Sequence, residues 1–125
     1  YAKAVQFITL NPCSHYSTEK WKSLAATNDT LVFYMAAKSL ANLAELLLRY
    51  SKKPNIPLAV VEQATTKHQK VHISTLKDCA VDFANKKFSS PSLVIVGEVV
   101  SLHKSFDWFS ADKAGSVFNE LVIVK

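Results

Sequence analysis

The stretch Glu62-Gln-Ala-Thr-Thr66 directly follows the apolar run Leu58-Ala-Val-Val61. A short apolar run that ends abruptly in small polar residues is typical of a buried strand that is followed by a tight loop. In open α/β sheets, ligands bind in the crevice beyond the carboxyl ends of the strands. This junction is therefore the first place to look for a binding site.

The same arrangement occurs twice more in the chain. Thr30-Leu-Val-Phe-Tyr34 runs into Met35-Ala-Ala37, and Ser92-Leu-Val-Ile-Val96 runs into Gly97. If the three strands lie side by side and parallel, Met35, Ala64 and Gly97 share one rim of one sheet. We take that rim as the candidate binding site.

The composition indicates one folded domain. The chain has 125 residues, of which 49% are apolar, which is enough for a substantial core. Its only two glycines, Gly97 and Gly115, cannot supply the glycine-rich loops that bind dinucleotides or nucleotide phosphates. The sequence shows neither a signal peptide nor a run of 18 apolar residues, so we expect no membrane-spanning helix and no membrane partner.

The net charge of +5 comes almost entirely from lysine, with Arg49 as the single arginine. Bidentate recognition of bases and phosphates favours arginine, so a nucleic-acid partner is not expected. Scattered lysines favour a solvated surface, and attraction of an anionic small molecule is the second interpretation. Cys13 and Cys79 lie far apart and form no CxxC motif, which indicates a reduced, cytoplasmic protein.

Predicted strands and helices alternate along the chain. The strands are expected at 4–10, 30–34, 57–62, 69–74 and 92–96, with an edge strand or a tail at 119–125; the helices are expected at 18–26, from the N-cap Ser39 to Tyr50, at 75–87 and at 98–109. This order predicts the α/β class: a single three-layer domain with a mostly parallel or mixed sheet of about five strands, flanked by helices. Antiparallel strands are expected, if anywhere, near the Ala64 loop.

Few residues have a spacing that indicates catalysis or metal binding. His68 and His72 form an HxxxH pattern, but in a strand four residues span about 13 Å, so no metal site is predicted. Cys79 falls on the buried face of a predicted helix and is expected to act as a small hydrophobic residue. Glu62 is the one acid at a strand end. A hydrogen bond that anchors a loop is the favoured interpretation for it, and a functional carboxylate is the alternative.

Met35 is the only methionine, and two interpretations of it stay open. It is either a flexible core residue or a soft apolar wall against a flat ring such as adenine. The small residues at Ala36, Ala37 and Ala64 would let a ligand come close to the backbone. Backbone N–H and C=O groups can recognise an adenine edge without a charged side chain.

Four motifs, in order, resemble a known family. They are Thr30-Leu-Val-Phe-Tyr-Met35; Val60-Val-Glu-Gln-Ala-Thr-Thr66 followed by Gln69-Lys70-Val71; Pro91-Ser-Leu-Val-Ile-Val-Gly-Glu-Val-Val100; and Trp108-Phe109. Over about residues 1–109 the chain resembles the C-terminal half of the uroporphyrinogen-III C-methyltransferases. These enzymes belong to the S-adenosylmethionine-dependent tetrapyrrole methylases.

The resemblance implies a fold and an activity. Enzymes of this family have two α/β domains, bind the cofactor in the cleft between them and are typically homodimers. They transfer two methyl groups from S-adenosyl-L-methionine to uroporphyrinogen III, which gives precorrin-2 for sirohaem and cobalamin biosynthesis and S-adenosyl-L-homocysteine as the second product. By resemblance, Met35 and Ala64 match cofactor-contacting positions and Pro91 matches a position beside the adenine. Ala36 stands where the family usually has glycine, so its methyl group is expected to narrow the pocket or shift the loop.

The resemblance also implies an absence. The family's N-terminal domain carries the glycine-rich first loop, the Gly-Gly-Asp cofactor segment and the residues that handle protons, and this sequence contains none of them. We therefore expect residues 1–109 to be the C-terminal domain and 110–125 an extension, and we name no catalytic residue. The alternatives are a domain of a later precorrin methyltransferase, or a non-catalytic binding module of the same fold.

Overall fold

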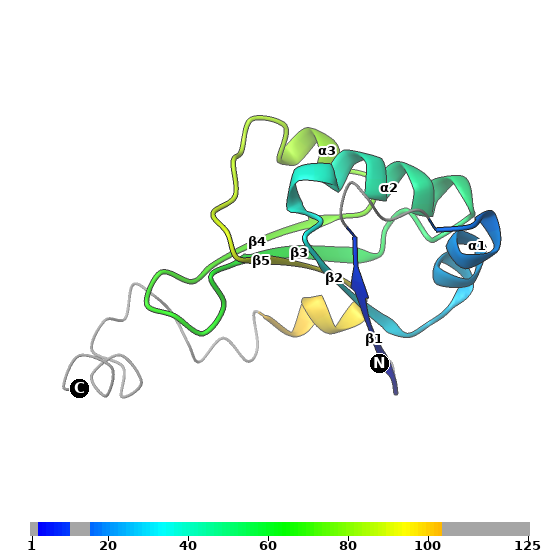
Figure 1. Ribbon diagram of the computed structural model, residues 1–125, viewed down its shortest axis with the longest axis horizontal. Coiled ribbons are helices and arrows are strands. Elements are labelled where there is room, and N and C mark those ends of the chain that lie inside the picture. The colour runs from blue at the N-terminus through cyan, green and yellow to red at the C-terminus, as the bar shows by residue number, and fades with distance from the viewer. Residues whose placement is uncertain (1–2, 11–15, 104–125) are drawn as a thin grey trace.

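The fold is a five-stranded sheet with helices α1, α2 and α3 on one face and the short helix η2 on the other (Figure 1). The computed structural model describes residues 3–10 and 16–103. The strands are β1 Val5–Thr9, β2 Thr30–Tyr34, β3 Pro57–Glu62, β4 Lys70–Thr75 and β5 Ser92–Val96. The helices are α1 Thr18–Ala26, η1 Ala37–Ser39, α2 Leu40–Arg49, α3 Cys79–Asp82 and η2 Glu98–Leu102.

The strand order is β1-β2-β5-β3-β4. The prediction of an α/β domain with a mixed sheet of about five strands is confirmed. Of the two forms predicted, the sheet is mixed and not mostly parallel, because among the described strands only β1 and β2 pair in parallel. β5 lies between β2 and β3 and runs opposite to both.

The prediction that Gly97 lies at the same rim as Met35 and Ala64 is wrong, because β5 runs antiparallel to β2 and β3. Gly97 follows β5 and lies at the far rim, where a Cβ atom added to it would be 3.2 Å from Oγ1 of Thr30, the first residue of β2. The β3–β4 hairpin reverses the chain, and the crossover through α3 then keeps β5 in the direction of β4. The start of β5, and not its end, therefore shares a rim with Met35 and Ala64.

The core lies between the sheet and the helical layer. Its largest fully buried side chains are Phe33, Leu24, Leu31, Leu43, Leu47, Leu58 and Leu76. They come from α1, α2, the strands and the turn before α3, so burial of apolar surface joins both layers.

Helix α1 has the predicted bounds because its local signals agree. The Ser17 hydroxyl accepts a hydrogen bond from the Lys20 N–H at 3.1 Å, as expected of an N-cap, and Trp21, Leu24 and Ala25 are buried. Helix α2 buries the predicted stripe of Leu40, Leu43 and Leu47. Its predicted N-cap is wrong in one respect: Ser39 makes no side-chain capping bond, because the chain enters α2 through the turn of η1.

The prediction of a helix over 75–87 is wrong, because α3 has only four residues. The chain leaves the helix at Phe83 and becomes irregular, which places Phe88 against Phe83 with ring centroids 5.6 Å apart. Both rings also contact the His72 ring, at 6.1 and 5.2 Å. Packing of this aromatic cluster outweighs the helical preference of the local sequence.

The predicted helix over 98–109 begins as the 3₁₀ helix η2. From residue 104 onward this prediction lies outside the described residues, as do Trp108-Phe109, the extension 110–125 with its possible edge strand, and Cys13. Within the described part of the chain, no helix is long and apolar enough to cross a membrane.

Candidate functional site

A cavity of about 440 Å³ opens at the rim where β2 and β3 end and β5 begins. It is lined by Tyr34, Met35, Val61, Ala64, Ser90, Pro91, Ser92 and Leu93. Three of the four predicted cofactor-binding residues, Met35, Ala64 and Pro91, therefore come together from three separate segments. The volume is within the range of about 300–1,000 Å³ that is usual for small-molecule sites.

Met35 ends β2 in a left-handed conformation, with φ of 61°. Its side chain is 63% exposed, so of the two interpretations the structure excludes the core residue and leaves the wall of a cavity. The fourth predicted residue, Ala36, is fully buried and does not line the cavity. Its methyl group packs in the hydrophobic core and so does not narrow this cavity, while the alternative, that it shifts the loop, stays a prediction.

The loop after β3 is a compact turn around Ala64. Its neighbours Gln63 and Thr65 are both left-handed, with φ of 47° and 66°. The Thr65 N–H donates to the Gln69 side-chain oxygen at 2.7 Å, and the Thr66 N–H donates to the Gln63 carbonyl at 3.2 Å. These bonds hold the small residue Ala64 at the cavity.

A second wall of the cavity is the segment 89–91, of which Ser90 and Pro91 line the cavity. The Pro91 carbonyl accepts a hydrogen bond from the Gln63 N–H at 2.7 Å, and the Ser90–Pro91 peptide bond is cis. The Ser89 N–H donates to Oε1 of Glu62 at 2.6 Å. Two consecutive residues at the end of β3 thus hold this wall by hydrogen bonds.

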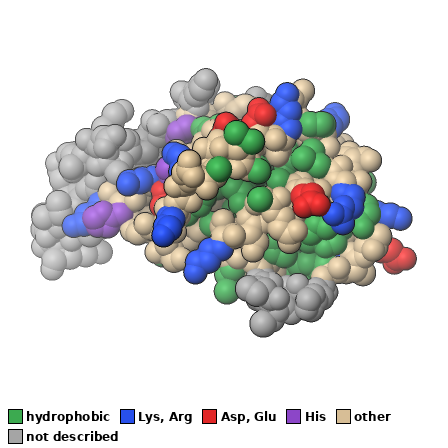
Figure 2. Space-filling model, turned by 90° about the horizontal axis from the view of Figure 1, so that it is seen from above, with side chains coloured by type: hydrophobic (Ala, Val, Ile, Leu, Met, Phe, Trp, Pro, Cys, Tyr) green, Lys and Arg blue, Asp and Glu red, His purple; other side chains and the backbone are tan. Residues whose placement is uncertain are grey.

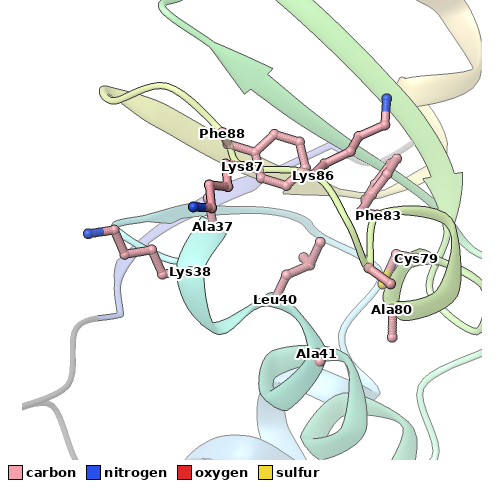
Figure 3. A pocket seen from close by; sticks show the side chains of 11 residues that line it. Ala37, Lys38, Leu40, Ala41, Cys79, Ala80, Phe83, Lys86, Lys87 and Phe88 are labelled. Atoms are coloured by element: carbon pink, nitrogen blue, oxygen red, sulfur yellow. The ribbon is translucent and has the colours of Figure 1, made fainter.

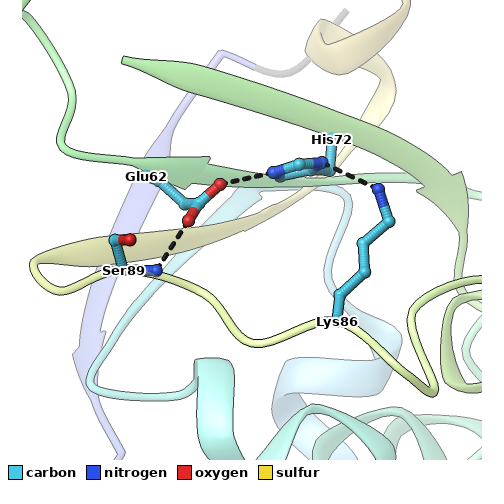
Figure 4. A network of polar contacts seen from close by, with 4 residues as sticks. All are labelled: Glu62, His72, Lys86 and Ser89. Carbon is cyan, nitrogen blue, oxygen red and sulfur yellow. Dashed lines mark hydrogen bonds and ion pairs between the residues drawn. The ribbon is translucent and has the colours of Figure 1, made fainter. Parts of the chain in front are cut away.

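Glu62 belongs to a chain of polar contacts that also includes His72 and Lys86 (Figure 4). Its second oxygen, Oε2, lies 2.5 Å from His72 Nε2, and His72 Nδ1 lies 3.3 Å from Lys86 Nζ. The favoured interpretation of Glu62 as a loop anchor is confirmed by the bond from Ser89.

Glu62 is only 5% exposed, yet its pKa is lowered. Burial by itself raises the pKa, but the hydrogen bonds from Ser89 and His72 and the nearby charge of Lys70 outweigh it. Glu62 is therefore ionised at neutral pH, and its charge is met by two hydrogen bonds.

Only one histidine of the HxxxH pattern belongs to this polar network. His72 lies in β4 and contacts Glu62, whereas His68 lies in the exposed turn before that strand. No cluster of three potential metal ligands is present among residues 3–10 and 16–103. Sequence reasoning missed the pairing of His72 with Glu62, which follows from the hairpin register: Val60 is opposite His72 and Glu62 opposite Lys70, so Glu62 and His72 are diagonal neighbours on one face.

A second cavity, of about 540 Å³, lies between the start of α2 and the segment 79–88 (Figure 3). Its apolar lining includes Leu40 and Phe88, and Lys38 and Lys87 stand at its edge. Burial raises the pKa of the Cys79 thiol in its floor, so this thiol stays protonated. Seen from the helical side, apolar side chains gather in the middle of the face, with basic and acidic side chains around them (Figure 2). The cavity contains none of the predicted site residues.

The family model described as Tetrapyrrole (Corrin/Porphyrin) Methylases matches residues 2–80, which is more than half of the chain. The chain belongs to the tetrapyrrole methylase family. The matched region includes Met35 and Ala64 but ends before Pro91.

Among individual proteins, the chain is similar to siroheme synthases. It is 36% identical to that of Vesicomyosocius okutanii, over 93% of this chain and 25% of the relative. It is 38% identical to that of Pseudomonas putida, over 90% of this chain and 24% of the relative. The chain thus spans about a quarter of the length of these relatives.

Solved structures of methyltransferases share the fold. The uroporphyrin-III C-methyl transferase from Thermus thermophilus, complexed with S-adenyl homocysteine, matches with a TM-score of 0.66 and 25% identity. That match covers 81% of this chain and 44% of the Thermus chain. A cobalt precorrin-4 methyltransferase matches with a TM-score of 0.68 but 16% identity, and this shows similarity of fold alone.

Proposed function

We propose that this chain forms one side of the S-adenosyl-L-methionine site of a uroporphyrinogen-III C-methyltransferase. The observation that carries the proposal is the convergence of Met35, Ala64 and Pro91 on one cavity. The fold and the family match support it, because a structural relative with 25% identity is complexed with S-adenyl homocysteine. The enzyme would methylate uroporphyrinogen III to precorrin-2 for sirohaem or cobalamin biosynthesis.

The residues present fit such a cofactor. Met35, Val61 and Leu93 give the cavity apolar walls that can contact a flat ring and exclude water. Ala64 adds little bulk, so a ligand can approach the backbone there. Ala36, the next residue after Met35, is buried in the core and would hold the Met35 loop in place from there.

When bound, S-adenosylmethionine supplies an electrophilic methyl group on a sulfonium centre. The part that falls to this chain is to bind and orient the cofactor, because bringing two reactants into line can supply a large share of a rate enhancement. No residue of the chain is assigned a proton-transfer role. We place those groups in the family's N-terminal domain.

Substrate, partner and location follow from the same proposal. Uroporphyrinogen III carries eight carboxylates, and a chain with a net charge of +5 attracts anionic molecules. The full enzyme would be a cytoplasmic homodimer. Analytical ultracentrifugation tests the dimer independently of the chemistry.

The test is a calorimetric titration with S-adenosylhomocysteine, carried out on the longest natural polypeptide that contains this sequence. We expect Met35→Ala to weaken binding roughly tenfold, because about 1–2 kcal/mol of apolar contact is lost. The control is Ile73→Ala, which removes an exposed apolar side chain on β4, away from the cavity, and should not change the affinity.

The mass of the product from uroporphyrinogen III then tests the substrate. Two added methyl groups are expected. Cofactor binding without methylation of uroporphyrinogen III would contradict the substrate assignment and favour a later precorrin step. Absence of cofactor binding would contradict the methyltransferase role and leave a non-catalytic binding module.

A further inference from the structure

We infer that Glu62 is a positioning residue for the cofactor cavity, and that His72 holds its carboxylate in place. This inference rests on the proposed function. Glu62 does not line the cavity of about 440 Å³ itself. It acts through the segment 89–91, of which Ser90 and Pro91 line the cavity.

The first argument is the position of the anchor. Ser89, which donates to Glu62, is two residues before Pro91, and the Pro91 carbonyl accepts from the Gln63 N–H. Both ends of the wall are thus tied to neighbouring residues of one strand end. The next residue in the chain, Ala64, lines the cavity. A single strand end therefore sets the distance between the Ala64 loop and the Pro91 wall.

The second argument is the strength of the tie. Burying a carboxylate costs free energy unless hydrogen bonds compensate its charge, so breaking the bonds between Glu62 and its donors is unfavourable. A hydrogen bond to an ionised acceptor is roughly twice as strong as one between neutral groups. The short N–H to carboxylate distance at Ser89, 2.6 Å, fits a bond of this kind.

The third argument is the role of His72. Its Nε2 faces the Glu62 carboxylate and its Nδ1 faces the Lys86 ammonium, which can only donate. In the tautomer that carries its proton on Nε2, the ring donates to Glu62 and accepts from Lys86. Lys86 is three residues before Ser89, so the network holds the stretch that leads into the segment 89–91 at two points.

The test compares variants that remove different parts of the network. In Glu62→Gln the amide oxygen can still accept from Ser89, but the amide nitrogen then faces the Nε2 proton of His72, donor against donor. We expect Glu62→Gln to weaken S-adenosylhomocysteine binding roughly fivefold, and Glu62→Ala to weaken it more.

Two variants at His72 separate hydrogen bonding from bulk. His72→Leu removes both polar contacts and should weaken binding like Glu62→Gln. His72→Gln offers an amide donor and an acceptor in their place and should restore most of the affinity.

The control for general loss of stability is Lys52→Met. Lys52 is 4% exposed, and its ammonium donates to the Thr27 carbonyl at 2.7 Å, near the C-terminal end of α1 and away from the cavity. We expect this variant to lower the melting temperature and leave the cofactor affinity unchanged.

The outcomes distinguish this inference from the function on which it rests. If the wild-type protein does not bind S-adenosylhomocysteine, the proposed function fails and the positioning role fails with it. If the wild type binds S-adenosylhomocysteine and both Glu62 variants bind it as tightly as the wild type, only the positioning role is overturned. Faster hydrogen exchange at the Ser89 amide in Glu62→Ala, together with weaker binding, would support it.

Discussion

At the scale of single residues, backbone strain gathers at the candidate site. Met35, Gln63 and Thr65 are non-glycine residues in the left-handed region, and all three are at or beside the cavity. Such a conformation costs about 1–3 kcal/mol per residue and persists only where the surroundings hold it. A fourth left-handed residue, Ser51, follows α2 away from the rim. Three of the four left-handed non-glycine residues in the described part of the chain thus lie at the rim that carries the cavity.

Met35 offers a way to separate strain from binding. We expect Met35→Gly to raise the melting temperature by a few degrees, because glycine removes the left-handed strain and the exposed side chain contributes little to stability. Both Met35→Gly and Met35→Ala should weaken S-adenosylhomocysteine binding. Thermal unfolding and calorimetry check the two effects separately. A fall in melting temperature for Met35→Gly would show that the side chain contributes to folding more than its exposure indicates.

Glu62 should make the free energy of unfolding depend on pH in the acidic range. Its pKa is lowered in the folded state, so it stabilises the fold fully above the unfolded value of about 4.3, and this contribution is lost as the pH falls through the folded pKa. The difference in unfolding free energy between wild type and Glu62→Gln should be constant above about pH 5 and shrink below it. Urea denaturation from pH 7 to pH 3 measures the difference. A difference that stays the same at pH 3 would contradict the lowered pKa.

At the scale of elements, the sequence predicts well where local pattern and burial agree. Strands β2, β3 and β5 and helix α1 have the predicted bounds, because the strands are short apolar runs that end in turn-forming residues and α1 buries residues at helical spacing. Strand β4 is shifted by one residue. The prediction fails for the length of helix α3, since the aromatic contacts that end this helix include His72 in β4, which local sequence does not reveal.

Those contacts make the segment 83–91 sensitive to one side chain. We expect Phe88→Ala to lower the unfolding free energy by about 2 kcal/mol, because it removes a partly buried ring that packs on Phe83 and His72. Loosening of the segment should also weaken cofactor binding, since Pro91 follows three residues later. Phe88→Leu, which keeps apolar bulk, is the matched control and should lose less of both. Equal affinity in Phe88→Ala and wild type would show that the wall is held by hydrogen bonds alone.

At the scale of the whole molecule, the direction of β5 decides which residues form the site. Local sequence marks 92–96 as a strand but contains nothing about its direction, which depends on the β3–β4 hairpin and the crossover that follows it. For this reason Met35 and Ala64 could be placed on one rim from strand ends alone, and Gly97 was placed there wrongly. Pro91 was matched by family resemblance, and the antiparallel direction of β5 explains why it lies at this rim.

The two rims should therefore respond to mutation independently. Gly97 has φ of 159°, and an added Cβ would lie 3.2 Å from the Thr30 hydroxyl oxygen, so Gly97→Ala should cost about 1–3 kcal/mol of stability. Because Gly97 is at the opposite end of the sheet from the cavity, the affinity for S-adenosylhomocysteine measured well below the melting temperature should not change. Met35→Ala should show the reverse pattern, with weaker binding and nearly wild-type stability. Weaker binding in Gly97→Ala, of the size seen for Met35→Ala, would mean that the far rim contributes to the site and that the cavity beside Pro91 is not the whole of it.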